Sequence, residues 1–499
     1  MTAAMATTPG GYLLVLAIVL PVVGMILSFV LGGRHVDRVA VAAMPFGLAI
    51  ALSIAAEVLR TGKPVVYIVG GWAPPLGIAL RADGFSAVML VTSALVLPAA
   101  MLFGRSYFAV PSGRNEARAP FAFWTLMQGL SAALVVVFVG GDLFTLYVAL
   151  ELLTFAAVPL VCLDGRAETL EAALRYLLFA LLGSILYLLG VGLLYGRYGM
   201  LDIVLLAEQT AAPGAAGRGV LVAGALMTAG LAAKTALFPL HLWLPPAHAN
   251  APAPASAVLS ALVVKGSFFL TVRLWFDVMP GLASEAAMAT LGVLGCGAIL
   301  YGSVMALRQA RLKLLIAYST IAQIGYLFLV FPLASGAGPW TSIGWTGGIM
   351  QVLAHAMAKS GMFLAAGLVA EAVGHDRIAG LRGVGRAMPV TLLAFGLAGV
   401  SLMGLPPSGG FLAKWWLLLA SVQSGQWAWC LVVLAGGLLA GGYVFRVVAP
   451  AIAGEPLVLK SPVSRGRESI ALALALAAIA LGFAPEALLE LLRIGRGAP

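Results

Sequence analysis

The stretch KTALFPLHLWLPPAHANAPAPASAVLSALVVKGSFFLTVRLW, residues 234–275, decides the fold of this chain. It contains the end of one apolar run and most of the next, and these two runs contain Lys234 and Lys265. A charged side chain at the centre of a membrane helix costs about 2.5–3.5 kcal/mol on insertion scales. A protein therefore keeps such a lysine only where the ammonium is paired or takes part in function.

The composition of the whole chain supports a membrane protein. Of the 499 residues, 62% are hydrophobic and 10% are charged, whereas a soluble domain carries about 25% charged residues. This excludes a soluble enzyme, a disordered protein and a nucleic-acid-binding domain. The net charge of +10 is typical of Lys and Arg in cytoplasmic loops. Cys162, Cys296 and Cys430 are too far apart in sequence to predict a metal site or a disulfide framework.

Apolar runs of about 20 residues, the length that crosses a bilayer, predict an all-α multi-pass membrane protein of fourteen transmembrane helices. The first run is too long for a signal-peptide core, so we expect a retained span. Segment 60–82 alternates and is rich in Gly and Pro, which predicts an extracytoplasmic hairpin. The predicted spans lie near residues 11–32, 37–58, 83–104, 119–140, 142–163, 172–196, 219–244, 252–276, 285–307, 313–334, 341–371, 388–421, 425–449 and 468–493.

The basic residues predict the orientation of the chain. With the N-terminus outside, the cytoplasmic loops contain seventeen Lys and Arg residues, including Arg34 and Arg114, and the opposite loops contain eight. The positive-inside rule then places both termini outside the cytoplasm. We expect a cytoplasmic (inner) membrane of the bacterial type.

Six ionisable residues are predicted to lie within the spans. Four lysines face a single deep acid, so structural ion pairs cannot balance them, and burial destabilises a lysine's charged form unless a carboxylate is near. This imbalance favours a proton relay over packing contacts. The six residues are Glu151, Lys234, Lys265, His355, Lys359 and Lys414.

Helical spacing adds further polar residues to this group. Gln351, His355 and Lys359 recur every four residues and so share one helix face. His241 and His248 flank the end of the seventh span, where a histidine is also common for purely structural reasons.

Two spans are predicted to be discontinuous, the seventh at Pro239 and the twelfth at a Pro- and Gly-rich segment. Proline interrupts the helical hydrogen-bond ladder, and paired broken helices in two halves mark ion sites in transporters with inverted repeats. We therefore expect an N-terminal three-helix segment with the hairpin (1–118), two inverted five-helix repeats (119–280 and 281–450) and a C-terminal helix (451–499). The predicted break in the twelfth span comprises Pro406, Pro407, Gly409 and Gly410.

Four sequence blocks resemble the proton-conducting antiporter-like subunits of complex I, of Mrp-type cation/proton antiporters and of energy-converting hydrogenases. The resemblance covers essentially all fourteen spans. The blocks are the stretch at 234–275, AYSTIAQIGY at 317–326, HAMAKSGMFLAAG at 355–367 and GLPPSGGFLAKW at 404–415.

The resemblance implies a role for each charged residue. It pairs Glu151 with Lys234, makes Lys265 the central lysine and Lys359 the lysine that bridges the two halves. Lys414 would be the terminal residue that hands protons outward. Gln323 lies where several relatives have histidine, which leaves its relay role open.

The resemblance favours the D-type subunit of an Mrp-type Na⁺(K⁺)/H⁺ antiporter, with a membrane-arm subunit of complex I (NADH:quinone oxidoreductase) or of an energy-converting hydrogenase as the alternative. A self-sufficient solute transporter should gather its polar groups at one site, and a scaffold needs no unpaired lysines. The sequence shows no pattern for a redox centre, metal, nucleotide or other cofactor, so we expect no catalytic centre in this chain. The expected partners are other membrane subunits, the lipid bilayer and protons, and the sequence leaves open whether Na⁺, K⁺ or only H⁺ is moved.

Overall fold

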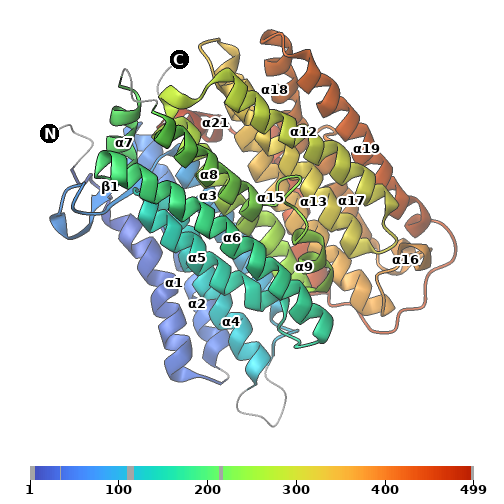
Figure 1. Cartoon of the computed structure of the whole chain (residues 1–499). Helices are drawn as coiled ribbons and strands as arrows, with labels where there is room; N and C mark the ends of the chain where they lie inside the picture. The colour runs from blue at the N-terminus through green and yellow to red at the C-terminus, as the bar shows by residue number, and fades with distance from the viewer. Residues whose placement is uncertain (1–5, 34, 110–116, 213–216, 496–499) are drawn as a thin grey trace.

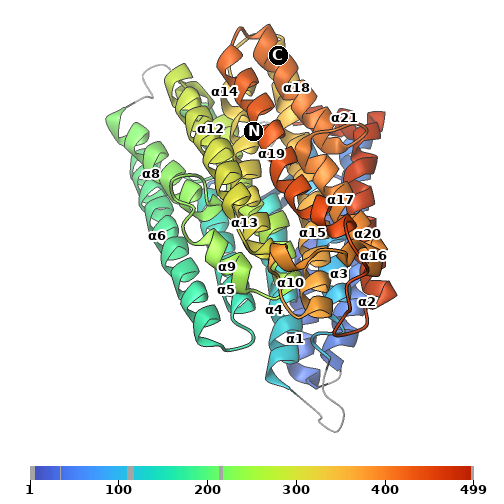
Figure 2. The ribbon, with the colours of Figure 1, turned by 90° about the vertical axis from the view of Figure 1, so that its right-hand side faces the viewer.

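The computed structural model describes residues 6–33, 35–109, 117–212 and 217–495, so Arg34 and Arg114 lie outside the described residues. Figures 1 and 2 show helices packed side by side in one bundle, with both termini toward the same end. Within the described ranges, twelve helices are long and apolar enough to cross a membrane. The predicted all-helical, multi-pass architecture is confirmed.

The helices and strands follow one another with short connections. The first half contains α1 (Tyr12–Leu31), α2 (His35–Thr61), β1 (Val65–Ile68), β2 (Ala79–Ala82), α3 (Gly84–Gly104), α4 (Arg118–Val139), α5 (Leu143–Val161), α6 (Ala167–Tyr198), α7 (Ile203–Thr210), α8 (Arg218–Thr235), α9 (Leu244–Asn250), α10 (Ala253–Val258) and α11 (Val264–Arg273). The second half contains α12 (Glu285–Arg308), α13 (Leu312–Phe328), α14 (Val330–Ala334), α15 (Trp340–Val373), α16 (Val384–Ala387), α17 (Pro389–Met403), α18 (Gly409–Gln423), α19 (Trp427–Ile452), α20 (Arg465–Ala480) and α21 (Glu486–Arg493).

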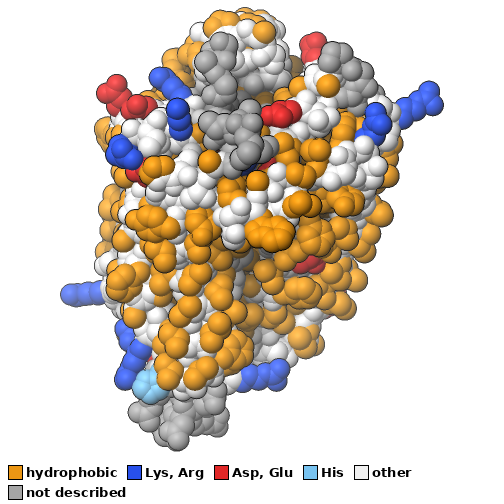
Figure 3. Space-filling model, turned by 90° about the vertical axis from the view of Figure 1, so that its left-hand side faces the viewer, with side chains coloured by type: hydrophobic (Ala, Val, Ile, Leu, Met, Phe, Trp, Pro, Cys, Tyr) orange, Lys and Arg blue, Asp and Glu red, His pale blue; other side chains and the backbone are white. Residues whose placement is uncertain are grey.

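The surface and the interior of the bundle differ as expected for a protein in lipid. Figure 3 shows hydrophobic side chains over the middle of one face, with most charged side chains toward its two ends. Helix α6 exposes leucines from Leu170 to Leu193. In contrast, the span Ala253–Val278 and helix α15 are wholly buried across their most apolar windows. These two inner helices carry three of the predicted relay residues.

The segment between α2 and α3 forms the predicted hairpin. Strands β1 and β2 pair antiparallel, with Val65 opposite Ala82 and Ile68 opposite Ala79. Val65, Val66 and Ile68 are buried and Tyr67 is half-buried, so burial does not alternate along β1.

The seventh predicted span is broken, but the helix ends before the proline. Helix α8 stops at Thr235, Ala236 adopts a left-handed conformation with φ of 59°, and the next helix starts only at Leu244. The Leu237 amide donates back to the Ala232 carbonyl at 3.0 Å, as in a common helix C-terminus. The left-handed residue, rather than Pro239, is therefore the point at which the helix ends.

The twelfth predicted span is also broken, over a shorter segment than predicted. Helix α17 ends at Met403, and Gly404 takes the left-handed conformation with φ of 83°. Pro406 and Pro407 lie in the break, but Gly409 and Gly410 are the first residues of α18, whose N-cap is Ser408. Their small size has another reason in the structure: a Cβ at Gly410 would lie 1.8 Å from the Ser401 carbonyl oxygen.

Other differences concern the eighth and the last predicted spans. The eighth contains two π-helical turns, Leu259–Val263 and Leu274–Val278, on either side of α11. The last is not one helix, because the chain turns at Phe483–Pro485 before α21 begins. The number of fourteen crossings, the inverted repeats and the four predicted parts of the chain stay predictions.

Candidate functional site

The pair expected in the first half, Glu151 and Lys234, is present as a mostly buried ion pair. Lys234 Nζ lies 3.2 Å from Glu151 Oε1, with side-chain exposures of 6% and 14%. The same ammonium donates to Thr154 Oγ1 at 2.9 Å and to the Leu150 carbonyl at 3.4 Å. Ser184 of α6 donates to Glu151 Oε1. Helices α5, α6 and α8 thus meet around one carboxylate.

Lys265 is fully buried on the inner helix and has a main-chain acceptor. Its ammonium donates to the carbonyl of Ser260 in the π-helical turn Leu259–Val263. A π-helical turn shifts the backbone hydrogen bonds of a helix by one residue and is frequent at functional sites. The chain thus provides a carbonyl acceptor for the lysine from its own helix.

Lys359 on α15 reaches helix α13 and connects to the surroundings of Lys265. Its ammonium donates to the Ile316 carbonyl at 2.9 Å and to the Ser319 hydroxyl. The Thr320 hydroxyl donates to the same Ile316 carbonyl at 3.0 Å and lies 3.0 Å from the Ser260 hydroxyl. Ser260 and Thr320 therefore bring the hydrogen-bond partners of Lys265 and Lys359 into contact.

Lys414 on α18 closes the broken end of α17. Its ammonium donates to the carbonyls of Leu402 at 2.6 Å and Met403 at 3.2 Å, and it lies 4.3 Å from the centre of the Tyr326 ring. The last carbonyls of a helix lack intrahelical donors and carry partial negative charge. The break therefore creates the acceptors that hold this lysine.

Two glutamines connect α15 to the acceptor of Lys414. Gln351 donates to Gln323 Oε1 at 2.9 Å, and Gln323 in turn donates to the Leu402 carbonyl at 3.0 Å. Since Gln351, His355 and Lys359 follow at one-turn intervals, this face of α15 leads from Lys359 toward the acceptor of Lys414. The structure thus brings Gln323 and Gln351 into the predicted group.

The three histidines differ in position. His355 lies one turn before Lys359 on α15, and His248 stacks on Phe363 with ring centres 4.7 Å apart. The ring of His241 packs 4.8 Å from the Tyr301 ring. In the part of the chain that the structure describes, no ring nitrogen of these three has a hydrogen-bond partner.

Positive charge exceeds negative charge among the buried ionisable residues of the candidate site. Among the described residues, Lys234 is the one lysine of the four with a carboxylate partner, and the other three donate to hydroxyl and carbonyl oxygens. No group of three or more His, Cys, Asp or Glu that could hold a metal occurs in the described ranges. Excess positive charge disfavours a bound metal cation, whereas a lysine can exchange a proton with a neighbouring group.

A second buried ion pair was not predicted from the sequence. Arg273, two turns after Lys265, donates to both oxygens of Asp83 at 2.5 and 2.6 Å and to Asp277 at 2.7 Å. Burial raises the pKa of the Asp83 carboxyl, but Arg273 and hydrogen bonds from Ser86 outweigh burial and hold it below its ordinary value. This pair joins the start of α3 to the end of the eighth span.

Comparisons with known proteins agree with this geometry. The family model described as NADH:quinone oxidoreductase/Mrp antiporter, TM matches residues 140–440, which include all six predicted relay residues. The N-type subunit of the NADH-quinone oxidoreductase of Desulforudis audaxviator is 37% identical over 400 residues, covering 79% of this chain and 76% of that protein. The D-type subunit of the Na⁺/H⁺ antiporter of Alkalihalophilus pseudofirmus is 29% identical over 456 residues, which cover 89% of this chain and 87% of that protein.

A solved structure shares the fold over nearly the whole length. One chain of the Mrp complex from Dietzia sp. superposes with a TM-score of 0.87 at 26% identity, covering 97% of this chain and 96% of that one. That neighbour is part of a multi-subunit membrane assembly. This chain therefore belongs to the NADH:quinone oxidoreductase/Mrp antiporter transmembrane family and is an antiporter-like, multi-pass membrane subunit of a multi-subunit complex.

Proposed function

We propose that this chain translocates protons through a relay formed by Glu151, Lys234, Lys265, His355, Lys359 and Lys414. The observation that carries the proposal is that Lys265, Lys359 and Lys414 are buried and donate to neutral oxygens, with no carboxylate partner among the described residues. An ammonium held by neutral oxygens is less stabilised than one held by a carboxylate. Such a lysine can therefore release its proton to a neighbour and take up another.

We place the relay along the plane of the membrane, because Glu151, Lys265 and Lys359 each lie near the middle of their helical segments and the helices beside Lys234 and Lys414 are interrupted. Non-helical backbone at that depth survives where protein or water satisfies it. Protons would enter in one half, pass between the halves at Lys359 and leave beside Lys414.

We further propose that the chain is the D-type subunit of an Mrp-type Na⁺(K⁺)/H⁺ antiporter in a cytoplasmic membrane. The overlay with the Mrp chain and the fuller coverage of the antiporter relative support this assignment. The higher identity to the N-type subunit of the oxidoreductase favours the alternative, a membrane-arm subunit of a redox-driven complex. In both, the energy for transport comes from other subunits or from an ion gradient.

One experiment separates the two assignments. The tagged chain is purified with its native partners and reconstituted in vesicles that contain a pH-sensitive dye. If the chain belongs to an Mrp-type antiporter, a Na⁺ or K⁺ gradient alone moves protons, and if it belongs to a redox-driven complex, proton movement requires an electron donor. An intact complex that moves protons under neither condition would contradict both assignments.

Dependence on partners gives a second test. Expressed alone in a host that lacks its own antiporters, this chain should not restore growth at high salt or alkaline pH, whereas the complete set of partner subunits should. Full rescue by this chain alone would instead identify a self-sufficient transporter.

A further inference from the structure

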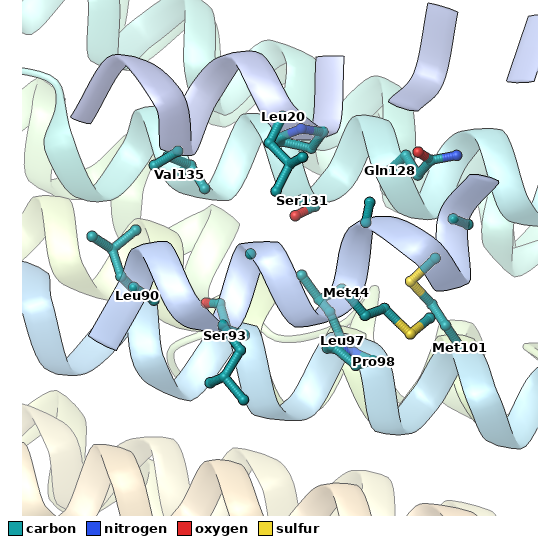
Figure 4. Close-up of a pocket in the computed structure, with 18 of the residues that line it drawn as sticks. Leu20, Met44, Leu90, Ser93, Leu97, Pro98, Met101, Gln128, Ser131 and Val135 are labelled. Carbon is teal, nitrogen blue, oxygen red and sulfur yellow. The ribbon is translucent and has the colours of Figure 1, made fainter. Parts of the chain in front are cut away.

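A pocket lined by Arg311, Arg377 and Arg446 lies between the α12–α13 connection, the segment before α16 and the last turns of α19. Figure 1 shows α16 at the end of the bundle opposite to the two termini. The pocket has a volume of about 570 Å³, within the range of about 300–1,000 Å³ for small-molecule sites. The pocket among α1–α4 in Figure 4 has about 90 Å³ and mostly apolar walls, so it offers neither the same room nor the same charge.

The backbone holds two of the three arginines opposite each other. Arg311 and Arg377 form an antiparallel bridge, and hydrogen bonds of 2.7 and 2.9 Å join the residues on either side of them. This is the closer of the two antiparallel pairings, with α-carbons about 4.5 Å apart and both side chains on one face. Like charges directly opposite each other are destabilising. A bound anion would therefore relieve a repulsion that the backbone maintains.

Carboxylates neutralise only part of the positive charge of the pocket. Arg311 Nε lies 3.0 Å from Asp376 Oδ1. Within the described ranges, Arg377 and Arg446 form no ion pair, and Arg446 Nη1 donates to the Leu307 carbonyl near the end of α12. A guanidinium has five N–H donors in a planar fork that matches a phosphate group. The pocket therefore combines net positive charge with donors for an anion.

Exposed apolar side chains continue from the pocket along α19 and α12. Leu438, two turns before Arg446, is 80% exposed, and Val304, one turn before the end of α12, is 43% exposed. A soluble anion would contact only the arginines, whereas a phospholipid would use both the arginines and this apolar surface. Basic pockets between membrane helices are known to bind anionic lipid head groups.

We propose that this pocket binds the phosphate group of an anionic membrane phospholipid, whose acyl chains lie along α12 and α19. The head group sits where α12 ends, α13 begins and α19 approaches its end, and arginines near helix ends reach the interface in this way. A zwitterionic lipid also has a phosphate, but its cationic group is repelled by the arginines. The site therefore favours a phospholipid with net negative charge.

Photo-crosslinking of the assembled complex in phosphatidylcholine vesicles tests this site. Two probes with the same acyl chains are compared, a diazirine-bearing phosphatidylglycerol and a diazirine-bearing phosphatidylcholine, and labelled peptides are mapped by mass spectrometry. We expect the phosphatidylglycerol probe to label α12 and α19 more strongly, and unlabelled phosphatidylglycerol to displace it. Soluble glycerol 3-phosphate should displace it little.

Three results of this experiment would overturn the proposal. Equal labelling by the two probes indicates ordinary acyl-chain packing against the helices. Labelling by neither probe indicates that a partner subunit fills the pocket. Full displacement by glycerol 3-phosphate indicates a site for a soluble anion.

Arginine variants show whether the pocket causes the preference. Arg377→Gln and Arg446→Gln should each weaken phosphatidylglycerol binding about fivefold, which corresponds to about 1 kcal/mol per basic residue at a membrane surface. Arg446→Lys keeps the charge and should keep most of the preference. Arg175, an arginine of α6 that is 47% exposed, provides the matched control, Arg175→Gln. Unchanged preference in assembled Arg377→Gln and Arg446→Gln complexes would overturn the proposal.

Discussion

Neutralising Glu151 should disable transport because its carboxylate is the acid paired with Lys234. At 3.2 Å and an effective dielectric constant of about 20, the attraction between the two charges is about 5 kcal/mol. Loss of one partner of a buried pair typically costs about 3–5 kcal/mol. Because the carboxylate is 14% exposed, we expect a destabilisation near the lower end of this range.

The test is a double-mutant cycle with Glu151→Gln and Lys234→Met, which preserve side-chain size. Each single variant should lose proton transport by about a hundredfold or more in vesicles that contain the assembled complex, because it removes a positioned proton-transfer group. The double variant should be little worse than the poorer single one, since the pair acts as a unit.

A surface pair on α6 supplies the matched control. Glu171 lies 3.2 Å from Arg175 and is 74% exposed, and exposed helix pairs contribute about 0.3–0.5 kcal/mol. Glu171→Gln should therefore leave transport near the wild-type rate. Wild-type transport in Glu151→Gln, or losses that multiply in the double variant, would refute the assignment of this pair to the relay.

Three further predictions concern the terminal lysine, the orientation and the second ion pair. Lys414→Arg should block transport, because a guanidinium does not release its proton. Lys414→Glu should retain part of the transport, because a protonated carboxyl can donate to the Leu402 carbonyl. If the arginine variant transports and the glutamate variant does not, in assembled complexes at matched expression, Lys414 has a packing role. A reporter that is active only in the cytoplasm should stay silent when fused to the C-terminus, and clear activity would overturn the orientation. Because the pKa of Asp83 is held below its ordinary value, the ion pair contributes its full stability above about pH 4 and loses it as the pH falls. Asp83→Asn should therefore lower the thermal unfolding temperature at neutral pH and make that temperature depend less on pH in acid. An unfolding temperature equal to that of the wild type at neutral pH would contradict this prediction.

Hydropathy and a few exceptional residues predicted much of this fold. Long apolar runs predicted the helices because the bilayer requires them, and the Pro-rich segments indicated both breaks. The sequence did not locate the ends of the broken helices, because a non-glycine residue such as Ala236 rarely takes a left-handed conformation. Gly409 and Gly410 were predicted to lie in the break because Gly and Pro commonly interrupt helices, whereas in the structure close packing explains these two glycines.

The charged residues of the site were also found from sequence, but their connections were not. Ser319, Thr320 and Ser260 join Lys359 to Lys265, and hydroxyls are too common in membrane helices to be singled out by spacing. The π-helical turn before Lys265 has no distinct sequence pattern. Arg273 was missed because its partner Asp83 is 190 residues away in sequence.

Replacement of Lys359 tests the central claim most directly, since the proposed relay passes between its two halves at this residue. Lys359→Met removes a fully buried ammonium from α15, and Lys460→Met removes an exposed one as a control. Loss of a positioned proton-transfer group typically costs at least about a hundredfold in rate. The relay predicts that loss in proton flux for Lys359→Met in assembled complexes, with Lys460→Met near wild type. Wild-type flux in assembled Lys359→Met complexes would contradict the relay.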